Sequence, residues 1–119
     1  MTVQIKRIYD VPAAEDGYRV LVDRMWPRGL AKGEARIDRW LKEVAPSTEL
    51  RRWFGHEPGR WDEFRKRYRD ELKGSDALVH ELVEKARDTP VTLLFSARDQ
   101  QHNQAVVLRE WLEERLGKH

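Results

Sequence analysis

The 119-residue sequence contains no cysteine. Without thiols the chain has no disulfide, no zinc–thiolate site and no cysteine nucleophile. Long hydrophobic runs are missing too, and the apolar stretch at residues 91–97 is far too short to cross a membrane. Since no apolar segment precedes the strand-like alternation that starts at Val3, we expect no signal peptide, a cytoplasmic location and no membrane partner.

The sequence also lacks a strong excess of charge of either sign. Lysine and arginine number 23 against 21 acidic residues, a formal net charge of +2. Both signs are interleaved, as at residues 65–71, which is more typical of a solvated helix face than of a nucleic-acid-binding arm. With 39% hydrophobic residues in periodic order, the length predicts one folded domain over residues 1–119.

Three segments are predicted to be β-strands: residues 3–8, 20–22 and 91–95. The second and third are continuously apolar, which indicates strands covered on both faces. A long helical stretch separates them, so they are expected to be parallel neighbours. The short connection at residues 10–17 permits a hairpin or a parallel arrangement of the first two strands, and we favour the parallel one. The predicted class is a three-layer α/β fold, with helices flanking a small, mainly parallel sheet of about three strands.

Apolar residues at helical spacing predict the remaining elements. The first such helix carries Ile37, Trp40, Leu41 and Val44 and ends before Pro46. Four more are expected: one capped by Ser47 and ended by Gly55, one with the stripe Trp61, Phe64, Tyr68 and Leu72, one capped by Ser75, and one over residues 101–116.

Polar residues are concentrated directly after the second and third predicted strands. In open α/β sheets, ligands bind beyond the carboxyl ends of the strands. If these two strands are parallel, both polar segments meet at one edge of the sheet. The candidates there are Asp23, Arg24, Trp26, Arg28, Arg98, Asp99, His102 and Asn103.

Each of these groups has a chemical role in the functional interpretation. The arginines suit phosphate or carboxylate, because a planar guanidinium binds such anions through two hydrogen bonds. Asp23 or Asp99 would act as a general base or hold a divalent metal ion. His102 and Asn103 would orient a substrate or stabilise charge, and the free N–H groups at the start of the last helix would attract an anion.

A structural interpretation stands beside each functional one. Asp23 and Arg24 could form an ion pair, and Arg28 could bind loop carbonyl groups. Asp99 is a natural N-cap for the last helix. His102 in the first helical turn is more often a surface residue.

A second cluster lies at residues 53–61, around a helix-to-helix corner with Gly55 and Gly59. The functional interpretation is a lid over the strand ends, with His56 as an acid or base. The structural interpretation is a packed corner in which His56 lies near a helix C-terminus, where a cation is favourable. Trp26, in the polar loop, would stack on a planar ligand.

Several long motifs closely resemble one protein family. They are Arg-Val-Leu-Val-Asp-Arg-Met-Trp-Pro-Arg-Gly-Leu at residues 19–30, Ala-Pro-Ser at 45–47, the run at 50–56, and Val-Thr-Leu-Leu-Phe-Ser-Ala-Arg-Asp at 91–99 with Asn103. Together they resemble the YeaO-like branch of the uncharacterised domain-of-unknown-function family 488 (DUF488) over nearly the whole chain. The resemblance implies a three-layer α/β fold and brings no established reaction.

The resemblance also implies a contrast with longer relatives, which carry a cysteine in the third strand and a Cys-His-Arg run after it. Here Phe95 and the stretch Asn-Gln-Ala at residues 103–105 stand in those places. A thiol-dependent activity therefore does not carry over to this chain, whereas Asp23, Arg24, Pro27 and Arg28 match the family pattern.

Two functions are consistent with these residues. The first is a small hydrolase or transferase acting on a phosphate-bearing or other anionic, nucleotide-like substrate at the C-terminal edge of the sheet. The second is a non-catalytic module that binds an anionic metabolite or nucleic acid. A small anionic ligand is the expected partner, and nucleic acid has weaker support. No cofactor is predicted, a divalent metal ion remains open, and the pattern sets no oligomeric state.

Overall fold

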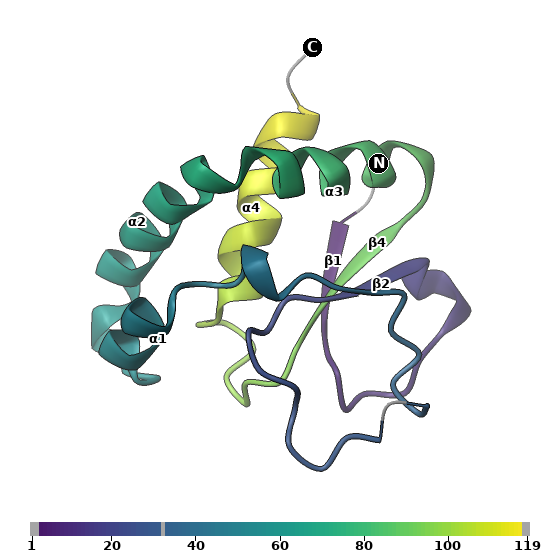
Figure 1. Cartoon of the computed structure of the whole chain (residues 1–119), viewed down its shortest axis with the longest axis horizontal. Coiled ribbons are helices and arrows are strands. Elements are labelled where there is room, and N and C mark those ends of the chain that lie inside the picture. Colours follow the sequence, from purple (N-terminus) through teal and green to yellow (C-terminus); the bar gives the residue numbers. More distant parts are fainter. Residues whose placement is uncertain (1–2, 32, 118–119) are drawn as a thin grey trace.

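The computed structural model describes residues 3–31 and 33–117, and it contains a parallel four-stranded sheet in the order β1-β4-β2-β3 (Figure 1). The strands are β1 Val3–Arg7, β2 Tyr18–Leu21, β3 Arg39–Trp40 and β4 Val91–Phe95. The parallel pairing of β2 with β4 is confirmed. β1 is also parallel to β4 and hence to β2, as favoured, but β4 lies between them.

The helices are α1 Thr48–Phe54, α2 Trp61–Leu72, α3 Asp76–Asp88 and α4 Gln104–Leu116. Ser47 caps α1, since its hydroxyl accepts a 3.1 Å hydrogen bond from the Leu50 N–H, and Gly55 ends it in the left-handed region at φ 53°. Ser75 precedes α3, but its side chain caps no N–H. Among the described residues, we find no helix that is long and apolar enough to span a bilayer.

The helix predicted around Ile37 to Val44 is wrong. This stretch forms the two-residue β3 and a 3₁₀ turn, Lys42–Val44. Its backbone N–H groups bind β2 instead of preceding helical turns: Asp38 donates to the Arg19 carbonyl and Leu41 to the Leu21 carbonyl, both at 2.9 Å. The fourth strand was missed because four apolar residues fit a helical turn as well as they fit an edge strand that packs against a neighbour.

The two faces of the sheet are covered differently. Alternate residues such as Val20, Leu93 and Phe95 face the main core, to which all four helices contribute. The opposite face carries Leu21 and Leu94, which pack with Ala35 and residues of the long β2–β3 connection. No helix among the described residues contributes to that second cluster, so the loop at residues 23–31 and 33–38 covers this face of the sheet in place of a helix.

The connection from β1 to β2 is held at the opposite end of the sheet from the carboxyl edge. Asp16 is 4% exposed, and its carboxylate accepts hydrogen bonds from Lys6, from Arg19 and from the Ala13 N–H. Gly17 follows at φ 64°, where a Cβ atom would lie 2.2 Å from the Pro90 carbonyl oxygen. The turn therefore requires glycine to bring β2 against the start of β4.

The mixed charges of α2 form a solvated, ion-paired surface, as predicted. Arg65 pairs with Glu110 at 2.8 Å and Arg69 with Glu114 at 2.7 Å, which links α2 to α4. Such exposed pairs contribute little stability each.

Candidate functional site

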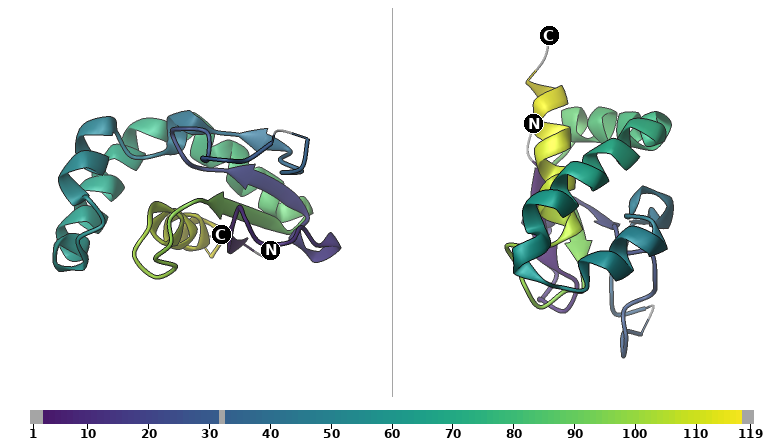
Figure 2. Two further views of the ribbon diagram at one scale, coloured as in Figure 1. Left: turned by 90° about the horizontal axis from the view of Figure 1, so that it is seen from below. Right: turned by 90° about the vertical axis from the view of Figure 1, so that its left-hand side faces the viewer.

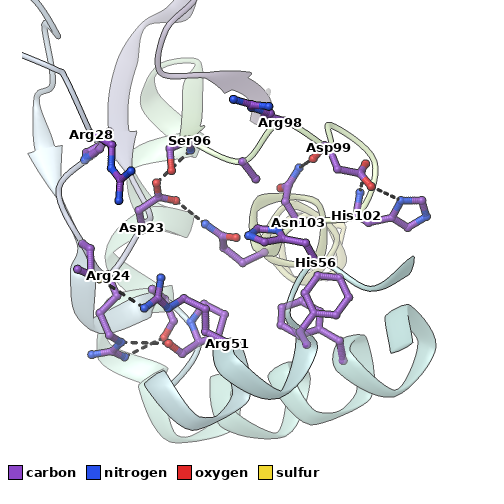
Figure 3. A pocket seen from close by; sticks show the side chains of 18 of the residues that line it. Asp23, Arg24, Arg28, Arg51, His56, Ser96, Arg98, Asp99, His102 and Asn103 are labelled. Carbon is purple, nitrogen blue, oxygen red and sulfur yellow. Dashed lines mark hydrogen bonds and ion pairs between the residues drawn. The ribbon is translucent and has the colours of Figure 1, made fainter. Parts of the chain in front are cut away.

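A pocket of about 660 Å³ lies at the carboxyl ends of β2 and β4, between the strand-end loops and α1 (Figure 3). In Figure 2, α1 and α2 form an arm at one end of the molecule, and the β4–α4 loop lies beside it. Every candidate residue from the sequence lines the pocket: Asp23, Arg24, Trp26, Arg28, His56, Arg98, Asp99, His102 and Asn103. The parallel sheet thus brings together two loops and a helical corner that are distant in sequence.

Asp23 links the two strand ends and α4. It is 8% exposed, and its carboxylate accepts a 3.0 Å hydrogen bond from the Ser96 N–H and another from the Gln104 side-chain amide. Its backbone carbonyl accepts the indole N–H of Trp40 at 2.7 Å. Burial raises the pKa of the Asp23 carboxyl, against the hydrogen bonds from Ser96 and Gln104, which lower it.

Arg24 does not form the ion pair with Asp23 that the sequence left open. Its guanidinium donates to the carbonyls of Pro46 at 3.0 Å and Ala45 at 3.1 Å. These bonds tie the loop after β2 to the segment that enters α1. Two of the guanidinium nitrogens are therefore engaged in holding a wall of the pocket.

Trp26 is built into the loop that lines the pocket. Its indole N–H donates to the Leu30 carbonyl at 2.8 Å, and its ring meets Trp40 edge-on at 5.4 Å between centroids. These contacts shape the loop, and the predicted stacking of Trp26 on a ligand remains a prediction.

Three arginines of the pocket form no ion pair with a carboxylate within residues 3–31 and 33–117: Arg28, Arg51 and Arg98. The charge of Arg51 still acts on Asp23, whose pKa it lowers. All three are exposed. Within the described part of the chain, no hydrogen bond joins the Arg28 guanidinium to a loop carbonyl, and the carbonyl of Arg28 itself accepts the Tyr9 hydroxyl at 2.8 Å. The hydrogen bond found for Arg51 is a weak 3.4 Å contact to the Met25 sulfur. Four arginines and two aspartates in all line the pocket, which favours an anion.

Asp99 and His102 form a hydrogen-bonded pair at one side of the pocket. The Asp99 carboxylate accepts the N–H groups of Gln101 at 2.9 Å and His102 at 3.0 Å, and its second oxygen lies 2.8 Å from Nδ1 of His102. The Gln101 N–H and the His102 side chain hold the pKa of the Asp99 carboxyl below its usual value. The His102 ring also meets Trp61 edge-on, with 5.2 Å between centroids.

The N-cap of α4 is Asn103, so the assignment of Asp99 to that position is wrong. The Asn103 side-chain oxygen accepts from the Ala105 N–H at 2.9 Å and the Val106 N–H at 3.2 Å. Its amide group donates to the Asp99 carbonyl at 2.9 Å. The cap takes two of the four N–H groups that this helix terminus leaves without helical partners, so fewer of them are available to an anion than the sequence suggested.

His56 projects from the α1 side toward the centre of the pocket (Figure 3). It follows Gly55 and has a left-handed backbone itself, with φ 59°. Its ring centroid lies 6.4 Å from that of Phe54, which stacks on Phe64 with centroids 4.4 Å apart. This side of the pocket is therefore aromatic, while Arg28 and Arg98 lie on the strand-end side.

A family model described as the inactive DUF488-N3 subclade matches residues 2–119. The chain belongs to this DUF488 subclade. It is 45% identical to the uncharacterized protein YeaO of Escherichia coli over 112 residues, which cover 94% of this chain and 97% of that protein. It is 44% identical to the uncharacterized protein Rv3073c of Mycobacterium tuberculosis over 115 residues, which cover 95% of each chain. No solved structure matches the chain.

The position implied for the cysteine of longer relatives is occupied in this subclade member by Phe95, which is 1% exposed and part of the main core. Phe95, directly before the pocket segment Ser96–Asp99, thus packs in the core and carries no acidic, basic or nucleophilic group. Among the described residues, no group of three or more histidine, aspartate or glutamate side chains is placed to hold a metal ion.

Sequence reasoning missed Arg51, Ser96 and Gln104 as parts of the site. Arg51 is one of two adjacent arginines on α1, and nothing in the sequence says which of them faces the strand ends. Gln104 reaches Asp23 across 81 positions of the chain, so its role depends on how α4 packs on the sheet.

Proposed function

We propose that this protein binds a small anionic ligand, carrying phosphate or carboxylate, in the pocket at the carboxyl edge of its sheet, and that it does so without turnover. The observation that carries the proposal is the convergence of Arg28, Arg51 and Arg98 on one cavity of about 660 Å³, as three exposed guanidiniums that form no ion pair in the described chain. Small-molecule sites typically have volumes of about 300–1,000 Å³.

Three observations support binding over catalysis. The subclade is described as inactive. Both oxygens of Asp23 accept hydrogen bonds from the protein, and both oxygens of Asp99 lie against protein donors or the His102 ring. These carboxylates therefore shape the pocket, while the guanidiniums remain available to a ligand.

The test is a thermal-shift and calorimetric titration with inorganic phosphate, pyrophosphate and sugar phosphates. A ligand at a hundred times its dissociation constant adds about 2.7 kcal/mol to the free energy of unfolding, which is an easily measured shift. Arg28→Ala and Arg51→Ala should lose this shift while keeping the unliganded melting temperature, because neither side chain has an ion-pair partner in the described chain.

Arg52 provides a matched control, since it is exposed on α1 next to Arg51 but does not line the pocket. Arg52→Ala should retain full binding. Equal losses in the Arg51 and Arg52 variants would point to general surface charge, and the absence of any anion-induced shift would refute the proposal.

Catalysis is the second candidate, and one observation favours it: Asp23 is a buried carboxyl in the pocket with a raised pKa. If the protein is a hydrolase, wild type should release product from a phosphorylated ligand that it binds. Asp23→Asn should then bind that ligand and release nothing. If wild type binds the phosphorylated ligand but releases no product, the function is binding without catalysis.

A further inference from the structure

The pocket has an apolar part that a bare anion would leave unused. Met25, Pro46, Phe54 and Phe64 line the same cavity as the arginines. Burial of apolar surface contributes to binding only if the ligand covers it with apolar surface of its own. The lining therefore fits a ligand with an anionic head and a larger apolar body.

Two stacked aromatic rings form part of this apolar lining, which favours a ligand with a planar body. Phe54 and Phe64 stack with an interplanar angle of 26°, and Trp61 continues the stack with its centroid 5.6 Å from that of Phe64. Phe54 and Phe64 are buried in the main core, so this wall is held rigidly. The exposed ring of His56 lies 6.4 Å from that of Phe54 and tilts 55° to it.

The backbone conformation of His56 also points to a ligand at this side of the pocket, independently of the apolar lining. It lies at φ 59°, directly after Gly55 at φ 53°, in a region where glycine is the ordinary residue. Side chains held in such conformations cluster at ligand sites, where the surrounding structure maintains them. The turn after α1 thus holds the His56 imidazole at the pocket. Glycine would adopt this backbone conformation with less strain but would leave the pocket without the ring.

From this arrangement we infer that the pocket binds a nucleoside monophosphate. Its planar heteroaromatic base lies against His56 and Met25, and its phosphate lies among Arg28, Arg51 and Arg98. The inference rests on the proposed anion-binding function and adds the chemical class of the ligand. His56 is then the residue that selects for the ring, and the three arginines are the residues that hold the phosphate.

Isothermal titration calorimetry of the full chain tests this with four probes: adenosine 5′-monophosphate, uridine 5′-monophosphate, ribose 5-phosphate and adenosine. At least one nucleotide should bind about tenfold or more tighter than ribose 5-phosphate, the scale expected for ring contacts. Adenosine without phosphate should bind much more weakly than the nucleotide.

His56→Gly is the decisive variant, because glycine accepts the backbone conformation and only the ring is lost. It should keep the melting temperature of wild type, lower nucleotide affinity about tenfold and leave ribose 5-phosphate affinity within about twofold. Met25→Ala, at a residue that is 61% exposed, should lower nucleotide affinity in the same direction. His80→Ala on α3, exposed and outside the pocket, should change nothing.

The results distinguish a failure of the nucleotide assignment from a failure of anion binding itself. If ribose 5-phosphate binds as tightly as both nucleotides, or if His56→Gly and Met25→Ala leave the nucleotide preference intact, the ring inference is overturned and anion binding stands. If adenosine binds as tightly as its phosphate, the phosphate assignment fails. If no phosphorylated probe binds, both proposals fail.

Discussion

Asp23 connects three separate elements through one buried carboxylate, and its removal should be measurable as a loss of stability. Asp23→Ala would leave the Ser96 N–H and the Gln104 amide without their acceptor. Both hydrogen bonds are partly buried, and a typical one contributes about 0.5–1.5 kcal/mol, so we expect the loss of the two to lower the free energy of unfolding by urea by about 1–3 kcal/mol. Arg28→Ala should cost far less, and an equal cost would show that Asp23 has no linking role.

Asp16 and Asp23 should give stability opposite dependences on pH. Burial raises the pKa of Asp16, but hydrogen bonds from Ala13, Lys6 and Arg19 outweigh it, so the folded pKa lies below the usual 3.8. Its contribution is therefore present above pH 3.8 and lost as the pH falls through the folded pKa. The folded pKa of Asp23 is raised, so its contribution is present below pH 3.8 and lost as the pH rises through the folded pKa.

Urea unfolding of wild type, Asp16→Asn and Asp23→Asn from about pH 2 to pH 7 measures both effects. The difference between wild type and Asp16→Asn should shrink as the pH falls. For Asp23→Asn, the stability of wild type relative to the variant should instead decrease as the pH rises through the folded pKa of Asp23. Parallel curves for the two variants would contradict the assignment.

Among the elements, the start of α4 depends on Asn103, which is 2% exposed. Asn103→Ala removes the acceptor for two helical N–H groups and the donor to the Asp99 carbonyl. The loss of such a cap costs about 1–2 kcal/mol. Asn103→Asp keeps the acceptor near a helix N-terminus and should cost less in thermal or urea unfolding. If both variants are equally destabilised, the capping oxygen is not what matters.

The β1–β2 connection depends on Gly17, because no other residue fits at this position. Gly17→Ala places a left-handed Cβ against the Pro90 carbonyl and should cost at least about 1–2 kcal/mol in urea unfolding. Gly59 is the matched control, because its added Cβ would meet nothing within 4 Å and its φ is not positive. Gly59→Ala should stay within about 0.5 kcal/mol of wild type, and a similar cost at both glycines would contradict the clash.

The helices that could be predicted are those in which apolar residues recur at helical spacing and capping or breaking residues mark the ends. Helix α2 has the stripe Trp61, Phe64, Tyr68 and Leu72, and α1 has both a serine cap and a glycine stop. β3 could not be predicted, because an edge strand of two residues is defined by its hydrogen bonds to β2 and has no pattern of its own. The start of α4 was placed three residues early, since Asp99 and Asn103 are both good caps and only packing chooses between them.

At the scale of the whole molecule, the two sides of the sheet should differ in local stability. Four helices cover one face, whereas the loop at residues 23–31 and 33–38 covers the other with a small cluster that includes Ala35. Opening that loop exposes little core, so its amides should exchange faster than those of the fully buried β4. Hydrogen exchange with mass spectrometry measures this, and equal protection of both segments would contradict it.

The sequence by itself determined which strand-end loops supply the site and which strands are buried. Apolar runs end in polar segments at Asp23 and Ser96, and parallel strands with a helical crossover must bring such segments to one edge. The tertiary structure decided which polar groups remain available. It engaged Arg24 with carbonyls, Asp23 with donors and the α4 N-terminus with Asn103, and it left Arg28, Arg51 and Arg98 facing the cavity. The reason is physical: a side chain finds its hydrogen-bond partners across the fold, up to 81 positions away for Asp23, and no local pattern encodes that distance.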